Sequence, residues 1–239
     1  MGPGSAISDQ EGDRRPARDS RMYDLLMGSP LIVFAGFALA GFAIVIPPQW
    51  RAPNVNYPLV FSEGVTAIFL AAQLVLVCIR RLPIRKVSGF FPKAWAFVAA
   101  NLGYAILLLP RANLSQFMVK LSTLIVVVGT LGSVIALIYL GRAFAILPQA
   151  RMLVRAGPYA WLRHPLYLFE QLAMLGIALQ YRQPWGLFLV AISFAMQFPR
   201  MGYEEQVLRE TFSEYDAYAR VTPRLIPFLP TVKHQHSMD

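Results

Sequence analysis

Six apolar segments divide the sequence and limit what it can fold into more than any other feature. They lie at about residues 30–46, 58–79, 94–109, 121–140, 166–180 and 185–198. A helix that crosses a bilayer needs about 20 apolar residues, with a range near 17–25, and the second and fourth segments meet this length easily. The third, fifth and sixth are shorter, so they must borrow flanking residues or tilt. Because unpaired backbone groups are costly in lipid, every crossing segment is expected to be helical.

The arginines and lysines between these segments alternate in number. From the N-terminal to the C-terminal segment they number four, one, five, two, four, one and five, which accounts for all 22. Loops that remain in the cytosol carry the excess of basic residues. The alternation therefore predicts six spanning helices in a multi-pass membrane protein. Both termini, and the second and fourth loops, are expected in the cytosol, where basic side chains face anionic lipid.

Composition supports the same fold class. The chain has 239 residues, of which 56% are hydrophobic and only 15% charged, whereas about a quarter of the residues of a soluble domain are charged. The net charge of +9 is concentrated in alternate loops, which favours a bilayer over a nucleic acid as the partner. Cys78 is the one cysteine, so an internal disulfide is excluded. We predict an all-α, polytopic integral membrane protein of about six transmembrane helices.

The chain divides into four regions by composition. Residues 1–24 are polar and begin with "MGPGS", which looks like the remnant of an expression tag. Residues 25–140 hold the first four apolar segments, residues 141–230 form a C-terminal core, and residues 231–239 form a loose tail. The tail contains His234 and His236. Because stable zinc sites need three or four ligands, this pair predicts no metal site.

Two polar clusters flank the last two apolar segments. The first is "GPYAWLRHPLYLFE", residues 157–170, with the only histidine of the first 233 residues. The second is "RMGYEEQVLRE", residues 200–210. The short link "YRQP" makes the two apolar segments an antiparallel hairpin, so both clusters should meet at the cytoplasmic surface. Arg200 and Glu204 are four residues apart and share a helix face, and Pro199 fits the first turn of that helix.

An amphipathic cytoplasmic helix is expected after the second cluster. Leu208, Phe212, Tyr215, Tyr218 and Ala219 recur at helical spacing, and Pro223 ends the pattern. This helix could cover the mouth of the hairpin. Within the apolar segments, Gly36-xxx-Ala40 and Gly129-xxx-Ser133 predict close helix packing.

Three polar residues lie in or near the apolar segments. They are Glu63, Gln73 and Asn101. Ionisable groups inside a membrane are candidates for function. Here their positions, with Glu63 near the outer interface, favour structural roles.

The two clusters together carry a family resemblance. "VRAGPYAWLRHPLY", the hydrophobic hairpin and "RMGYEEQVLRETFSEYDAYARVTPRLIPFLP" resemble the isoprenylcysteine carboxyl methyltransferase family and its phospholipid N-methyltransferase relatives. The resemblance covers roughly residues 140–230. It implies a membrane methyltransferase that uses S-adenosylmethionine (SAM), with residues 141–230 as its core. The family usually has glycine where this chain has Phe169, and a ring there could reshape the pocket.

The resemblance also assigns roles to individual residues. Arg200 would face the methyl acceptor, and Glu204 would hold the cofactor from one side. The remaining cofactor contacts would come from the 151–167 region: Arg151, Met152, Leu153, Val154, Tyr159, His164, Pro165, Leu166 and Tyr167. A cationic, water-soluble donor and a lipid-like acceptor can meet only at the membrane–cytosol boundary. The active site is therefore expected on the cytoplasmic face.

The chemistry of these residue types favours some acceptors over others. A guanidinium can hold a carboxylate bidentately, so Arg200 favours a carboxylate acceptor. Glu204 suits the hydroxyl and amino donors of SAM. An amine lipid or a small thiol is the alternative acceptor, and an amine would need a base such as Glu205. Two other classes stay open, an NADPH-dependent sterol-type reductase and a transporter or scaffold subunit.

Overall fold

The computed structural model describes residues 17–226, except residues 52, 54, 56, 111 and 182. The described chain is mostly helical. Its elements, in order, are α1 (Ala17–Trp50), α2 (Tyr57–Ile79), strand β1 (Arg85–Lys86), α3 (Phe90–Asn101), the 3₁₀ helix η1 (Leu102–Leu108), α4 (Gln116–Leu140), η2 (Gly141–Ala143), strand β2 (Gln149–Ala150), η3 (Gly157–Ala160), α5 (Pro165–Ala178), α6 (Trp185–Thr211) and α7 (Tyr215–Val221). The expectations for the expression-tag remnant and for His234 and His236 lie outside the described residues.

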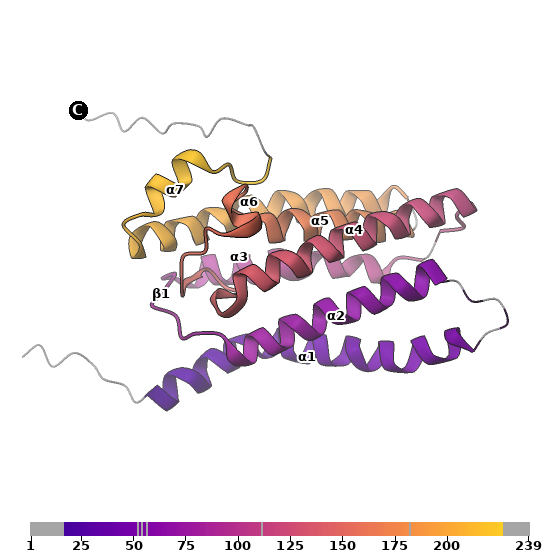
Figure 1. Ribbon diagram of the computed structural model, residues 1–239, viewed down its shortest axis with the longest axis horizontal. Helices are drawn as coiled ribbons and strands as arrows, with labels where there is room; N and C mark the ends of the chain where they lie inside the picture. The colour runs from indigo at the N-terminus through magenta and orange to yellow at the C-terminus, as the bar shows by residue number, and fades with distance from the viewer. Residues whose placement is uncertain are drawn as a thin grey trace, which may run out of the picture.

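The long helices run side by side along one axis (Figure 1). The closest pairings are α4 with α5, α1 with α2, α2 with α4 and α3 with α6. All six predicted apolar segments are helical, although the third consists of α3 followed by the tighter η1. Two helical stretches, Val60–Ile79 and Gln116–Ala143, are long and apolar enough to cross a membrane. The apolar parts of α1 and α5 are shorter, at Ile32–Ile44 and Pro165–Ala178.

Close contact between α4 and α5 explains one of the two small-residue motifs. A side-chain carbon at Gly129 would collide with the backbone of Ala173 and Phe169, and one at Gly132 would collide with the Phe169 ring. The prediction of close packing at Gly129-xxx-Ser133 is therefore confirmed. The prediction at Gly36-xxx-Ala40 is wrong, because Gly36 is exposed and a Cβ added there would meet no atom within 4 Å.

The helix after the hairpin differs from the expected one. Pro199 lies inside α6, which continues from Trp185 to Thr211, so Pro199 does not begin a helix. The expected amphipathic helix is split at Phe212, whose extended backbone separates α6 from α7. Its apolar stripe still packs together: Tyr215, Tyr218 and Ala219 are buried, and the partly buried Leu208 and Phe212 pack against them. Thr222, just before Pro223, is extended and ends the helical region.

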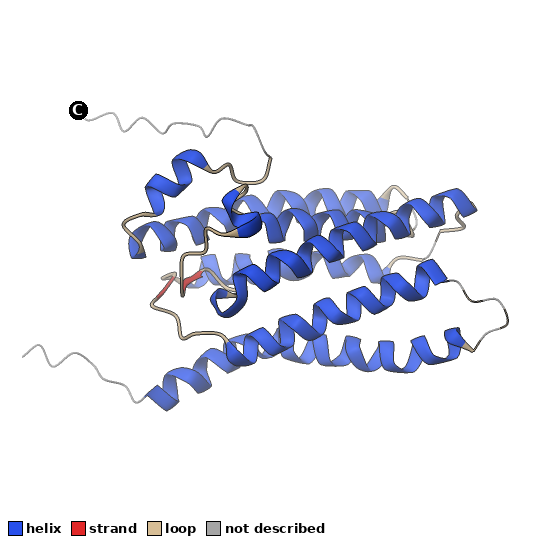
Figure 2. Cartoon of the chain, viewed as in Figure 1, coloured by secondary structure: helices blue, strands red, loops and turns tan. Residues whose placement is uncertain are grey.

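One end of the bundle holds the connections expected in the cytosol. The antiparallel pair β1–β2 joins two of the basic loops (Figure 2). The backbone N–H of Arg81 donates to Arg142 O at 2.9 Å. Asp24 of α1 accepts hydrogen bonds from Arg80 at 2.8 Å and Arg151 at 2.6 Å, all three side chains being buried. These contacts hold the start of α1, the end of α2 and the loop after α4 together.

Candidate active site

The α5–α6 hairpin brings the two polar clusters into contact, as the sequence predicted. His164 is the residue just before α5, and Pro165 occupies its first turn, where the missing N–H costs nothing. The His164 ring stacks on Tyr167, with centroids 5.4 Å apart and an interplanar angle of 10°. The Tyr167 hydroxyl donates to Oε1 of Glu204, which lies 37 positions further along the chain. Glu204 Oε2 is 3.8 Å from His164 Nδ1.

Arg200 also lies over the ring of Tyr167. Its guanidinium carbon is 4.6 Å from the centre of the ring, in a cation–π contact. Nη1 donates to Gln197 Oε1 at 3.3 Å, and Nη2 donates to the carbonyl oxygen of Ile146 at 2.9 Å. Nε is 3.9 Å from Glu204 Oε1 and has no hydrogen-bond partner. The predicted face shared by Arg200 and Glu204 is therefore present.

Glu205 faces away from this group and lies in a cluster of cationic side chains. Its Oε2 accepts from Arg163 and Arg224, both at 2.8 Å, while Oε1 accepts from Arg224 Nε at 2.9 Å and faces His164 Nε2 at 3.1 Å. Burial alone would raise the pKa of Glu205. Hydrogen bonds with His164 and Arg224, together with the charges of His164 and Arg163, lower it from 4.5 to about 2. A carboxylate with so low a pKa is a poor base at neutral pH.

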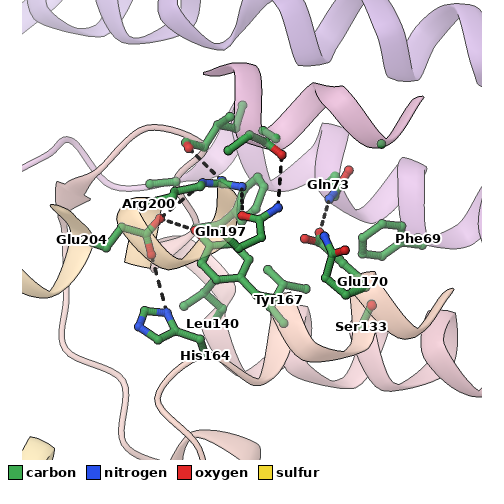
Figure 3. A pocket seen from close by; sticks show the side chains of 18 of the residues that line it. Phe69, Gln73, Ser133, Leu140, His164, Tyr167, Glu170, Gln197, Arg200 and Glu204 are labelled. Carbon is green, nitrogen blue, oxygen red and sulfur yellow. Dashed lines mark hydrogen bonds and ion pairs between the residues drawn. The ribbon is translucent and has the colours of Figure 1, made fainter. Parts of the chain in front are cut away.

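A cavity of about 370 Å³ begins at the His164–Glu204 pair and continues between the helices. This volume falls in the usual range of ligand pockets. Figure 3 shows His164, Arg200 and Glu204 on one side of Tyr167, and Gln73 and Glu170 on the other. Apolar side chains line the rest of the cavity; those from α1 and α2 are Phe34, Ala38, Phe42, Phe69 and Leu70. The cavity thus joins a polar end to an apolar interior.

Most of the predicted site residues meet at this cavity. Its lining includes nine of them: Met152, Leu153, Val154, Tyr159, His164, Leu166, Tyr167, Arg200 and Glu204. Arg151 and Pro165 are not among the lining residues. The Arg151 side chain instead bonds to Asp24 and Gln149, and also to the carbonyl oxygen of Arg81. Its side chain therefore joins α1 to the loop after α4.

Phe169 does not narrow the cavity. Its ring fills the space above Gly132 on α4 and is not among the lining residues. The α5 side chains that do line the cavity lie on another face of the helix. The Phe169 ring fits at this position because the facing residue of α4, Gly132, has no side chain.

Glu170 and Gln73 line the cavity although sequence reasoning gave neither a role in the site. Gln73 was treated as structural, and Glu170 was not singled out. The signal was present, because an ionisable residue in an apolar helix is a candidate for function. Gln73 Nε2 donates to Glu170 Oε1 at 3.3 Å across the α2–α5 gap.

Tyr159 presents a buried hydroxyl to the same cavity. The hydroxyl has no hydrogen-bond partner. Burial, followed by the nearby charges of Glu204 and Glu170, raises the pKa of Tyr159 well above its usual range. The group therefore stays protonated and can donate to a ligand. Among the described residues, no cluster of three or more histidine, cysteine or acidic side chains could hold a metal ion.

Sequence comparisons agree with this geometry. Residues 114–215 match the sequence model of the family described as phospholipid methyltransferase. The matched segment runs from just before α4 to the start of α7, so it contains the hairpin, His164, Arg200 and Glu204. This part of the chain is therefore similar to the phospholipid methyltransferase family.

Two bacterial proteins are similar over about the same length. The nickel-cobalt-cadmium resistance protein NccN of Alcaligenes xylosoxydans xylosoxydans is 32% identical over 114 residues, which cover 46% of this chain and 53% of NccN. The cobalt-zinc-cadmium resistance protein CzcN of Cupriavidus metallidurans is 33% identical over 113 residues, which cover 45% of this chain and 51% of CzcN. The matched region thus spans about half the length of each of these relatives.

Proposed function

We propose that this protein is an integral-membrane methyltransferase that uses SAM to methylate a lipid-like or apolar acceptor. The observation that carries the proposal is the cavity, which joins the Tyr167–Glu204–His164 group to an apolar space between helices. A cationic, water-soluble donor suits the first part. A greasy acceptor suits the second.

The residues at the polar end fit the cofactor. Glu204 is only 19% exposed and turns toward the cavity, so it can accept from ribose hydroxyls or an amino group. The ring faces of Tyr159 and Tyr167 suit an adenine or a sulfonium. SAM supplies an activated methyl carbon. The protein has to align the reactants and exclude water, which can contribute about 7–11 kcal/mol.

Two side chains, Arg200 and Glu205, were expected to interact with the acceptor's nucleophile, and both already have partners within the protein. A carboxylate acceptor was expected from Arg200, whose Nε has no hydrogen-bond partner. Nη1 and Nη2 already donate to Gln197 and Ile146. A bidentate grip on a carboxylate would have to use Nε and a further N–H of the guanidinium. Glu205, the base expected for an amine acceptor, is bound by Arg163 and Arg224 and does not line the cavity.

We further propose six membrane crossings, with both termini and the polar end of the cavity in the cytosol. The alternation of basic residues supports it, as do the contacts that gather Arg80, Arg142 and Arg151 at one end of the bundle. Single cysteines introduced as Arg51→Cys and Ser88→Cys, in a Cys78→Ser background, should be labelled from opposite sides of oriented membranes. Labelling of both from one side would contradict this topology.

Calorimetry on the purified protein in nanodiscs tests the proposed function. SAM should bind and NADPH should not, because each cationic side chain lining the cavity already faces a carboxylate or protein oxygens. NADPH binding without SAM binding would favour the reductase class. Binding of neither would overturn the proposal.

A further inference from the structure

Glu170 is a carboxyl group in the apolar interior of the cavity. It lies in α5, three residues beyond Tyr167, and so about one helical turn further from the His164–Glu204 group. Its hydrogen-bond partner is Gln73 of α2, at 3.3 Å. Within the described residues, no arginine, lysine or histidine forms an ion pair with it. Such a group is costly inside a membrane protein unless it has a use.

The neighbouring amides leave hydrogen-bond acceptors without partners. A carboxylate only accepts, so the Gln73 amide nitrogen must face Glu170 and its oxygen must point elsewhere. That oxygen is buried without a partner in a side chain 6% exposed, and Gln171 Oε1 is also buried without one. Both residues line the cavity. A ligand that satisfies this region has to donate hydrogen bonds.

Each cationic side chain around the cavity already faces a carboxylate, although Arg163 Nε and Arg200 Nε have no hydrogen-bond partner. Arg163 donates to Glu205, and His164 lies between Glu204 and Glu205. Arg200 donates to Gln197 and Ile146 and lies 3.9 Å from Glu204. A phosphate in this cavity would have to compete with these partners. The lining therefore favours a ligand with no phosphate.

We propose that Glu170 and Gln73 form an acceptor-binding subsite for a lipophilic amine that carries no phosphate. The inference rests on the proposed methyltransferase function and names its substrate class. The amine end would donate to Glu170 and Gln73, and its tail would occupy the space lined by Phe34, Phe42 and Phe69. Under this proposal the nucleophile of the acceptor is an amine, which Glu170 attracts, and not the carboxylate expected from the sequence.

Glu170 also provides a place for the proton that this reaction releases. An amine that arrives as an ammonium loses one proton to the Glu170 carboxylate and becomes nucleophilic. Its nitrogen then attacks the methyl carbon. A nitrogen–carbon bond forms while the sulfur–carbon bond breaks, and the bonding electrons remain on sulfur. The product is a methylated ammonium, and Glu170 returns its proton to water before the next cycle.

The test compares acceptors of equal tail length in nanodiscs. Hexadecylamine, palmitic acid and palmitoyl lysophosphatidylethanolamine are each supplied with isotopically labelled SAM. Hexadecylamine should be methylated fastest. Glu170→Gln keeps the shape and removes the charge, and should lower that rate by about 30-fold, the effect of losing one partner of a desolvated pair. Hexadecylamine binding measured without SAM should weaken in parallel, while SAM affinity stays unchanged.

Matched variants separate this role from a structural one. Glu63→Gln removes a carboxyl from α2 that does not line the cavity, and should change neither rate nor binding. Gln73→Leu should weaken hexadecylamine binding even if Glu170→Gln does not fold. If SAM binds but palmitic acid is preferred, the amine subsite is overturned and the methyltransferase stands. If the phospholipid reacts as fast as hexadecylamine, the exclusion of phosphate is overturned. If SAM does not bind, the methyltransferase itself fails.

Discussion

Glu204 and Glu205 are adjacent in α6, yet they lie in regions that differ in how fully their charges are paired. Around Glu205, each carboxylate oxygen accepts from at least one arginine, and the side chain is 2% exposed. Around Glu204, Tyr167 bonds to one oxygen, Arg200 is 3.9 Å away, and the side chain is 19% exposed toward the cavity. The Glu205 region is saturated, whereas the Glu204 region retains acceptor capacity.

The difference lies in what each region connects. Arg163 and His164 precede α5, and their backbone N–H groups donate to Pro223 O and Arg224 O at 2.8 and 3.1 Å. With Glu205, they tie the segment after α7 to the start of the hairpin. Glu204, one residue earlier in α6, lines the cavity. Two identical side chains thus lie in different surroundings because a helix turns by about 100° per residue. Under the proposed function, Glu205 stabilises the fold and Glu204 binds the cofactor.

The largest effect should come from Glu205→Gln. Removing this charge leaves Arg163 and His164 buried without their carboxylate, which should reduce the free energy of unfolding by about 3–5 kcal/mol. Thermal unfolding in detergent would measure the change. Protein that folds should still bind SAM. A variant that unfolds like wild type would show that the Glu205 cluster is not what holds this end together.

Glu204→Gln should have the reverse pattern. SAM affinity should fall by about 30-fold, equivalent to about 2 kcal/mol, because charge-assisted hydrogen bonds to the cofactor become neutral ones. The melting temperature should change little. Calorimetric titration of both variants makes the comparison direct. Wild-type affinity in Glu204→Gln would contradict the assignment of Glu204 to the cofactor.

Acid should weaken the Glu205 region within a defined range. Because the folded-state pKa is about 2, against 4.5 for the free group, the stabilisation is complete above about pH 4.5 and is lost as pH falls toward 2. Between pH 4.5 and pH 2, the free energy of unfolding of the wild-type protein should therefore fall. This loss should be smaller than the loss that Glu205→Gln causes at neutral pH. Melting curves of both proteins across this range would test it. The variant should show a smaller slope; equal slopes would mean that other carboxyl groups dominate.

An exposed ion pair at the same end should matter least. Arg209 Nε is 2.7 Å from Asp216 Oδ1, but the two side chains are 49% and 57% exposed. Arg209→Ala should cost at most about 1 kcal/mol, since solvent screens such pairs. The same melting assay applies. A loss close to that of Glu205→Gln would show that exposure is a poor guide to the importance of charges here.

Much of the helical arrangement could be predicted from residue pattern. The helices could be predicted from the apolar segments and from the alternation of basic residues. The hairpin could be predicted from the four-residue link between the last two segments. The contact between His164 and Glu204 followed, since a hairpin must return its ends to one surface. Nine of the eleven predicted site residues line one cavity. Arg151 and Pro165 could not be separated from them, because family resemblance assigns a stretch of chain and not the direction of each side chain.

The sequence by itself determined the class of fold, because backbone hydrogen bonding in an apolar chain allows few alternatives to helices. It also determined which polar motifs meet. Only the tertiary structure decided that Glu205 lies among Arg163, His164 and Arg224. It also decided where Phe169 places its ring, and that Gln73 of α2 meets Glu170 of α5 across 97 positions. These outcomes depend on helix rotation and on packing between distant segments. The periodicity of a helix shows which residues share a face. It does not show which other helix that face will contact.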